Sequence, residues 1–216
     1  TTLFRSLLPG VIFPPISYCI ILQQYNCVID GWGFYHKQSI RNHFQILSAN
    51  GPLTLTLPVK SVKGKPTPLN QVELEEGHWY KPMLTAIQSA YGKSPFYFYF
   101  KDELTDILSS LPGTRLFEAQ IRIMQWLEKY TGLPHPNLAE QWDIAENEYN
   151  FDLRKIKKKW EIYSPIQSYH QVFMDRFPFR EDLSILDLLF NLGPQAKTYI
   201  AQHAPVRLVP EDHQSS

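Results

Sequence analysis

The fold is decided by the stretch GFYHKQSIRNHFQILSANGPLTLTLPV, which covers residues 33–59. It predicts a β-hairpin, because Asn50-Gly51 tolerates the positive φ of a tight reversal and alternating residues flank it on both sides. Alternation along a strand places every second side chain on the same face of a sheet. The set expected to face the core is Ile40, Asn42, Phe44, Ile46, Leu53, Leu55, Leu57 and Val59. The opposite face carries Arg41, His43, Gln45, Thr54 and Thr56. This polar face is either an ordinary solvated sheet surface or the floor of a polar cleft.

The rest of the chain predicts an α+β fold, with a mixed sheet built on the central hairpin and packed against several helices. Residues 7–13 and 27–30 are expected to be strands. Apolar residues at helical spacing, together with flanking proline and glycine, predict helices at residues 16–25, 79–91, 101–111, 115–130, 183–192 and 195–203. We expect one domain over residues 1–205, followed by a tail at 206–216.

Composition excludes several classes of protein. Hydrophobic residues make up 44% of the 216 and charged residues 19%, which is typical of a globular chain rather than a disordered one. The 21 basic residues balance the 21 acidic ones, so no net positive charge favours nucleic acid or a membrane surface. No apolar run approaches the roughly 20 residues that span a bilayer, and no signal peptide is visible. A cytoplasmic location is therefore expected, while the oligomeric state is left open.

The two cysteines, Cys19 and Cys27, show no CxxC or Cys/His spacing for a metal. We expect both to be buried, reduced thiols. The alternative is a thiol nucleophile with a distant histidine, but neither cysteine has an electropositive sequence context. Gly-rich phosphate loops and a dinucleotide fingerprint are also missing from the sequence. The sequence therefore predicts no metal and no cofactor.

A series of segments follows one family pattern in order and spacing. The segments are YHKQSIRN with HFQILSANGPLTLTLPV (35–59), SAYGKSPFYFYF (89–100), DLR (152–154), YHQVF (169–173) and LSILDLLFNLGP (183–194). Together they resemble the WbqC-like family, in the form common among Bacteroidetes, over roughly residues 9 to 200. The resemblance implies a role in O-antigen or surface-polysaccharide biosynthesis. It also implies a transferase that passes an aminoacyl (glycyl) or acyl group to an aminosugar.

The family pattern places the ligand site on a cationic, hydrogen-bonding cluster. Its members are Tyr35, Lys37, Gln38, Arg41 and Asn42. Arginine holds a carboxylate or phosphate with paired N–H groups, and amide side chains bind carbonyls and hydroxyls. The predicted ligand is therefore an anionic small molecule, either a nucleotide-sugar or an activated acyl group. The matching segments add further predicted substrate-binding residues, which are Tyr91, Ser94, Arg154, Tyr169 and Gln171.

His43 and Tyr35 are the predicted catalytic residues, each placed to move a proton. Two positions depart from the family pattern. Gly33 stands where the family usually has an acidic residue, and Met83 stands where it usually has a histidine. The alternative hypothesis is therefore a ligand-binding relative that has lost these two groups and catalyses no reaction.

For some of these residues an ordinary structural role is the competing interpretation. Asn42 shares a predicted face with Phe44, so it would be a buried amide that fastens the hairpin. Tyr169 would pack in the core. Arg154 opens a basic run that extends to Lys159, which is either a solvated helix face or a phosphate-binding surface.

Overall fold

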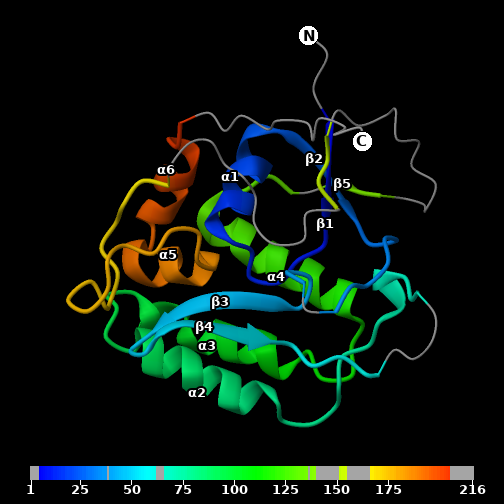
Figure 1. The fold of residues 1–216 in the computed structure, drawn as a ribbon, viewed down its shortest axis with the longest axis horizontal. Coiled ribbons are helices and arrows are strands. Elements are labelled where there is room, and N and C mark those ends of the chain that lie inside the picture. Colours follow the sequence, from blue (N-terminus) through cyan, green and yellow to red (C-terminus); the bar gives the residue numbers. More distant parts are fainter. Residues whose placement is uncertain are drawn as a thin grey trace, which may run out of the picture.

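The computed structural model describes residues 5–37, 39–61, 66–135, 137–139, 151–154 and 166–204. The α+β class is confirmed (Figure 1). Short parallel strands form one sheet in the order β5-β2-β1-β6. These strands are β1 (Arg5–Pro9), β2 (Asn26–Asp30), β5 (Asn137–Leu138) and β6 (Phe151–Asp152). The sheet thus joins the start of the chain to segments more than a hundred residues away.

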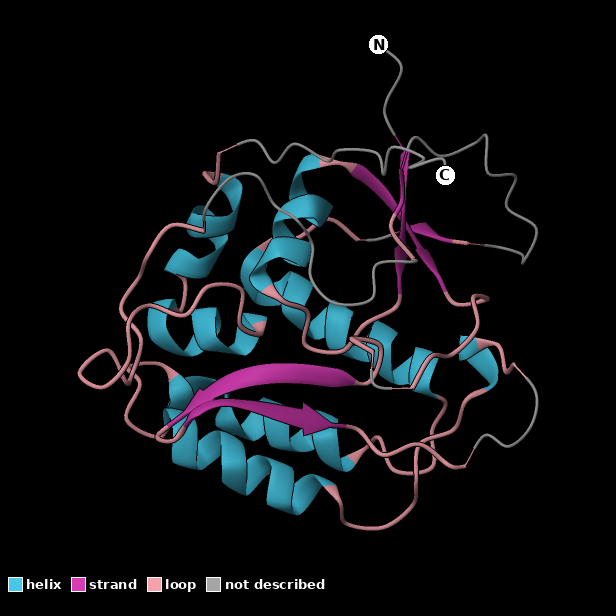
Figure 2. Ribbon diagram, in the orientation of Figure 1, coloured by secondary structure: helices cyan, strands magenta, loops and turns pink. Residues whose placement is uncertain are grey.

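The hairpin forms a second, separate sheet (Figure 2). Its strands are β3 (His43–Ser48) and β4 (Gly51–Thr56), paired antiparallel with Ser48 opposite Gly51. Gly51 has a φ of 104°, which confirms the predicted reversal. The sequence predicted one mixed sheet built on the hairpin, and this prediction is wrong, because the hairpin forms a sheet of its own. The outer edge of β3 is instead met by the chain before α5, where the Ser184 N–H donates to the Gln45 carbonyl over 2.8 Å.

The helices lie on both sides of the hairpin. They are α1 (Ile16–Gln24), α2 (Tyr80–Tyr91), α3 (Tyr97–Ser109), α4 (Leu116–Thr131), α5 (Ile185–Leu192) and α6 (Gln195–Ala201), with a 3-10 turn η1 (Leu69–Gln71). Figure 1 shows α2 and α3 on one side of the hairpin and α1, α4 and α5 on the other. Helix α1 is apolar nearly all round and correspondingly buried along most of its length, as predicted.

The largest differences from the predicted boundaries are at the end of the first strand and at the start of α3. The first strand ends at Pro9 instead of continuing to Phe13, which has a φ of 34° and packs its ring 4.9 Å from that of Phe44. Helix α3 begins at Tyr97, earlier than expected, because its aromatic first turn supplies buried residues Tyr97 and Phe100 to the core. In both places core packing overrides the local pattern.

Residues 182–185, near the C-terminal end of the described chain, form hydrogen bonds with the start of α1. The Ile16 N–H donates to the Leu183 carbonyl over 3.1 Å, and the Ile185 N–H donates to the Pro14 carbonyl over 2.8 Å. The Asp182 carboxylate accepts from the Ser17 N–H over 2.8 Å and so caps the N-terminus of α1. Segments from opposite ends of the described chain thus share one core. Within the described residues, no helix combines the length and apolarity that crossing a membrane requires.

Candidate functional site

The candidate site lies at the carboxyl edge of the parallel sheet. Strand β1 ends at Pro9 and β2 ends at Asp30, and a glycine follows each of them. The chain after β6 continues through Arg154 at the same edge. In sheets built from parallel strands, ligands bind outside the carboxyl ends of the strands. The edge therefore has the location expected of a binding site.

Arg154 links the two strands that flank β1. Its Nη1 lies 3.1 Å from Asp30 Oδ2, while its Nε and Nη2 lie 2.9 and 2.7 Å from the two oxygens of Asp152. These hydrogen bonds, led by those to Asp152, raise the pKa of Arg154 against the opposing effect of burial. Arg154 is therefore a fixed cation in an ion-pair network, and it does not belong to a solvated basic surface.

Asp30 occupies the space beside Gly33. Its carboxylate accepts from the Trp32 N–H over 2.8 Å and from the Gly33 N–H over 3.1 Å. A Cβ atom at position 33 would stand only 2.8 Å from Asp30 Oδ2. The acidic group that the family pattern leads one to expect at position 33 is thus missing, but a carboxylate from position 30 lies at the same place. Asp30 precedes Gly33 by only three residues, yet it was not among the predicted site residues, because the sequence pattern does not show where its carboxylate points.

Arg41 approaches the same edge from the turn that precedes β3. The prediction that it lies on the outer face of the hairpin is wrong, since β3 begins only at His43 and Arg41 is 5% exposed. Its Nη2 donates to the Arg154 carbonyl over 3.1 Å, the only hydrogen bond that its guanidinium makes to described residues. Burial lowers the pKa of Arg41, whereas the Asp30 charge raises it. Residues in a turn do not follow the alternation of a strand, so the alternation could not predict the direction of the Arg41 side chain.

Gln120 of α4 fixes the backbone of Arg41 against β1. Its Nε2 donates to the Gly10 carbonyl over 3.0 Å and to the Arg41 carbonyl over 2.8 Å. Gln120 Oε1 sits 2.1 Å from where a Cβ on Gly10 would be, so a glycine is required there for this close approach. Gln120 was not among the predicted site residues. A lone glutamine on the apolar stripe of a helix was the only sequence signal.

Tyr35 and Asn42 are placed beside Arg41. Asn42 Nδ2 donates to the Leu57 carbonyl over 3.0 Å, so this buried amide does fasten the two arms of the hairpin. Tyr35 is half-buried. Burial raises the pKa of its hydroxyl, while the nearby Asn42 side chain and the charge of Arg41 lower it. Because the net shift is upward, Tyr35 is a neutral hydrogen-bond donor at pH 7.

Two other predicted site residues, His43 and Lys37, make no hydrogen bond with Arg41 among the described residues. His43 Nδ1 lies 2.9 Å from Thr56 Oγ1 across the hairpin, and burial lowers the pKa of His43. Lys37 is exposed on the surface. Gln38 lies outside the described residues. Gln45, Thr54 and Thr56 are exposed as well, which favours the solvated sheet face over a cleft floor.

A second polar cluster collects Tyr91, Tyr169 and Gln171 around Asp187. The Tyr169 hydroxyl and Gln171 Nε2 lie 2.5 and 3.0 Å from Asp187 Oδ2. Tyr91 interacts with the same carboxylate and also accepts a hydrogen bond from the Leu47 N–H. All of these side chains are buried. Three predicted ligand-binding residues therefore surround an acid that the prediction omitted, although an aspartate inside LSILDLLF was a visible signal.

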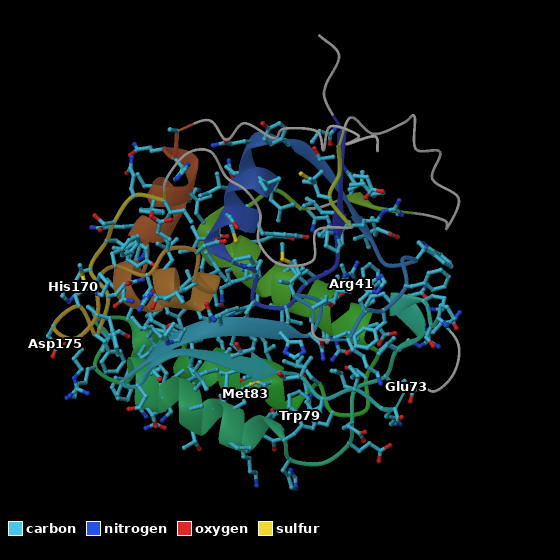
Figure 3. The ribbon with its side chains drawn as sticks, viewed as in Figure 1. Arg41, Glu73, Trp79, Met83, His170 and Asp175 are labelled. Carbon is cyan, nitrogen blue, oxygen red and sulfur yellow. The ribbon has the colours of Figure 1, made fainter. Side chains whose placement is uncertain are left out.

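Ser94 and Met83 have structural surroundings. Ser94 Oγ donates to the Tyr91 carbonyl over 2.7 Å and closes the end of α2. Met83 is 6% exposed and belongs to the hydrophobic core. Figure 3 shows Met83 on α2 and Arg41 on the other side of the hairpin ribbon. The residue that replaces the family's histidine is thus a core residue in this chain. No group of three or more histidine, cysteine, aspartate or glutamate side chains in the described ranges is arranged to hold a metal ion.

The model of the WbqC-like protein family matches residues 11–149 and 143–199 of this sequence. The chain belongs to the WbqC-like protein family. One relative is "Uncharacterized protein Rv1507c" from Mycobacterium tuberculosis (strain ATCC 25618 / H37Rv), which is 25% identical over 197 residues, 77% of this chain and 83% of the relative. No solved structure matches the chain. The family match includes both polar clusters, since it extends from before Tyr35 to beyond Asp187.

Proposed function

We propose that this WbqC-like protein binds the anionic group of a small molecule at Arg41, at the carboxyl edge of the parallel sheet. One observation carries the proposal. Arg41 is nearly buried, yet its guanidinium makes a single hydrogen bond to described residues, to the Arg154 carbonyl. Holding a guanidinium out of water costs free energy unless its N–H groups find acceptors. A bound carboxylate or phosphate supplies them in paired geometry.

The neighbours of Arg41 support a ligand with both an anionic and a hydrogen-bonding part. Asp30 and Asp152 both pair with Arg154, and the Asp30 charge also acts on Arg41. The Tyr35 hydroxyl is neutral and can donate to an oxygen of the ligand. Nucleotide-sugars and activated acyl groups both offer an anion next to carbonyl or hydroxyl oxygens, and they remain the proposed ligand classes.

We further propose that the bound molecule is a donor or acceptor in transfer of an aminoacyl (glycyl) or acyl group to an aminosugar, in surface-polysaccharide assembly. In such a step the sugar amine attacks the acyl carbon, an amide bond forms, the leaving group departs and the amine loses a proton. Tyr35 would stabilise the oxygen that becomes negative. His43 would accept the proton, since its lowered pKa leaves the imidazole neutral at pH 7.

Binding without turnover is the second candidate, and a specific observation favours it. The carboxylates of Asp30 and Asp152 both form ion pairs with Arg154. His43 forms a hydrogen bond with Thr56, and among the described residues it makes no hydrogen bond with Arg41. Under this second candidate, the site binds its ligand and leaves it unchanged.

The experiment compares wild type with Arg41→Ala, Arg41→Lys and a control, Arg176→Ala, which removes an exposed arginine whose ion pair within the described residues is with its neighbour Asp175. Thermal unfolding is followed with a UDP-linked aminosugar, with acetyl-coenzyme A and with glycine. At least one probe should raise the melting temperature of wild type and Arg176→Ala, act weakly on Arg41→Lys and not act on Arg41→Ala. An equal shift in Arg41→Ala would refute the site. Release of product from the same mixtures, read by mass spectrometry, decides between transferase and binding protein.

A further inference from the structure

Strand β4 has an outer edge that no described residue covers. Ser48 pairs with Gly51, and the Leu57 N–H donates to the Asn42 carbonyl over 2.9 Å. Bonded and non-bonded pairs alternate along an antiparallel ladder. The backbone groups of Leu53 and Leu55 therefore point toward β3, and those of Pro52, Thr54 and Thr56 point away from it.

The two edges of the hairpin differ in what meets them. On the β3 side, Gln45 accepts from the Ser184 N–H and Leu47 donates to the Tyr91 hydroxyl. On the β4 side, the outward N–H and carbonyl groups of Thr54 and Thr56 have no hydrogen-bond partner among the described residues. Both threonines are exposed. An open strand edge of this kind is a template for pairing with another strand.

The open part of the edge has a definite length. Beyond Thr56 the chain at residues 73–75 already lies alongside, because the Glu75 N–H donates to the Pro58 carbonyl over 2.9 Å and the Lys60 N–H donates to the Glu73 carbonyl over 2.8 Å. At the other end, Pro52 has no N–H and the hairpin turns. A long foreign strand would collide with residues 73–75. The space suits a strand as short as β4 itself.

We propose that β4 pairs with β4 of a second copy of this chain, antiparallel about a two-fold axis through Thr54. Each Thr54 N–H then donates to the carbonyl of the partner's Thr54, and each Thr56 N–H donates to the carbonyl of the partner's Pro52. The same patch serves both copies, as an isologous dimer requires. The two hairpins become one continuous sheet.

Charge and apolar surface are consistent with this occupant. The sequence of β4, GPLTLT, has no charged side chain, and the whole chain has a formal net charge of zero, so copies do not repel one another. Leu53 is 37% exposed although it is a large apolar residue. In the paired arrangement it lies directly opposite the partner's Leu55, where cross-strand contact removes both from water.

The test measures the mass of the full chain by sedimentation velocity over a hundredfold range of concentration. Wild type should shift from monomer to dimer as concentration rises. Thr54→Pro deletes an N–H that points away from β3, so the bonds within the hairpin are kept and the dimer is lost. Thr54→Val keeps the N–H and should dimerise like wild type. Leu53→Lys puts like charges into the contact and should raise the dissociation constant at least tenfold.

A wild type that stays monomeric throughout the range would overturn the proposal. So would a Thr54→Pro variant that dimerises as strongly as wild type while its circular dichroism is unchanged. If Thr54→Pro fails to fold, Leu53→Lys decides, since it alters only an exposed side chain. Capture of an unrelated extended peptide by a monomeric wild type would assign the edge to a different occupant and would also refute pairing between copies.

Discussion

Tyr169 holds its hydroxyl 2.5 Å from Asp187 Oδ2 in the interior of the molecule. Gln171 donates to the same oxygen over 3.0 Å and ties its own chain segment to the Arg180 backbone. Burial raises the pKa of Asp187, and its interactions with Tyr169, Tyr91 and Gln171 lower it only in part. No cation appears among the described groups that act on this carboxylate. The core therefore contains an acid whose ionised form is destabilised relative to water.

The first prediction is a pH dependence of stability that disappears in Asp187→Asn. Because the folded pKa lies above the ordinary value of about 3.9, the contribution of Asp187 to stability is full below that value. It is lost as pH rises through the raised folded pKa. Urea unfolding at a series of pH values from 4 to 8 should show the variant gaining stability relative to wild type as pH rises. Asp102→Asn, an exposed change on α3, controls for losing one negative charge. Parallel curves for wild type and Asp187→Asn would contradict the prediction.

Gln120→Leu should destabilise the fold and weaken the proposed ligand site together. The change leaves the Gly10 and Arg41 carbonyls without their buried donor. Such a loss costs about 1–3 kcal/mol in the free energy of unfolding. Chemical denaturation checks the cost, and thermal shifts with the same probes check binding. Gln88→Leu on the exposed side of α2 should leave both unchanged. Full binding by a destabilised Gln120→Leu would show that Arg41 is held in place by other contacts.

A double-mutant cycle tests the close approach of Gly10 to Gln120. Alone, Gly10→Ala places a Cβ 2.1 Å from Gln120 Oε1 and should cost about 1–3 kcal/mol through overpacking. Shortening the side chain in Gln120→Ala removes the atom that clashes. The double variant should therefore be more stable than the sum of the single effects predicts, although the nearby Phe117 ring leaves part of the cost. If the effects of the two single changes on the free energy of unfolding are additive, the backbone around Gly10 shifts to relieve the clash and Gln120 is not its cause.

Asp182 should affect the stability of the fold through both its carboxylate and its backbone conformation. It caps α1 through the Ser17 N–H and has a φ of 58°. Asp182→Asn retains a capping oxygen and tolerates that φ, so it should stay near wild type. Asp182→Gly loses the cap, worth about 0.5–2 kcal/mol. Asp182→Ala loses the cap and adds backbone strain, so it should be the least stable. Thermal melting of the three variants gives the order of stability. If Asp182→Ala is at least as stable as Asp182→Gly, the prediction of backbone strain at this position is wrong.

The cysteines should be unreactive in the folded protein. Cys19 and Cys27 are free and buried. Burial raises the pKa of Cys27 to about 12 and that of Cys19 further still. At pH 7.5 few thiolates exist, so a thiol reagent such as DTNB should react only as the protein unfolds. Labelling at the rate seen in urea, but in native buffer, would revive the thiol-nucleophile hypothesis.

Part of this structure followed from local sequence. The reversal at Asn50-Gly51 and the helices α1, α2 and α4 were predictable, because turn chemistry and periodicity act over a few neighbouring residues. The family motifs grouped Tyr35, Lys37, Gln38, Arg41 and Asn42, and of these the structure places Arg41, Tyr35 and Asn42 beside one another.

Other features had no local signal. The face of Arg41 was mispredicted since the turn at residues 40–42 interrupts the alternation before β3 starts. Tyr91, Tyr169 and Gln171 were grouped with Arg41, but they surround Asp187 in a separate cluster. A sequence motif identifies a set of residues, but it does not show which of their side chains are in contact in the folded protein.

The sequence by itself determined the family, the α+β class, the hairpin and the residue types available for binding an anion. Only the tertiary structure decided that Asp30, Asp152 and Arg154 form one ion-pair network at a sheet edge, with Arg41 and Gln120 beside it. The physical reason is the parallel sheet. Parallel neighbours are joined by long crossover connections, so the strands that bring these side chains together are far apart in the chain and no spacing within the sequence encodes their pairing.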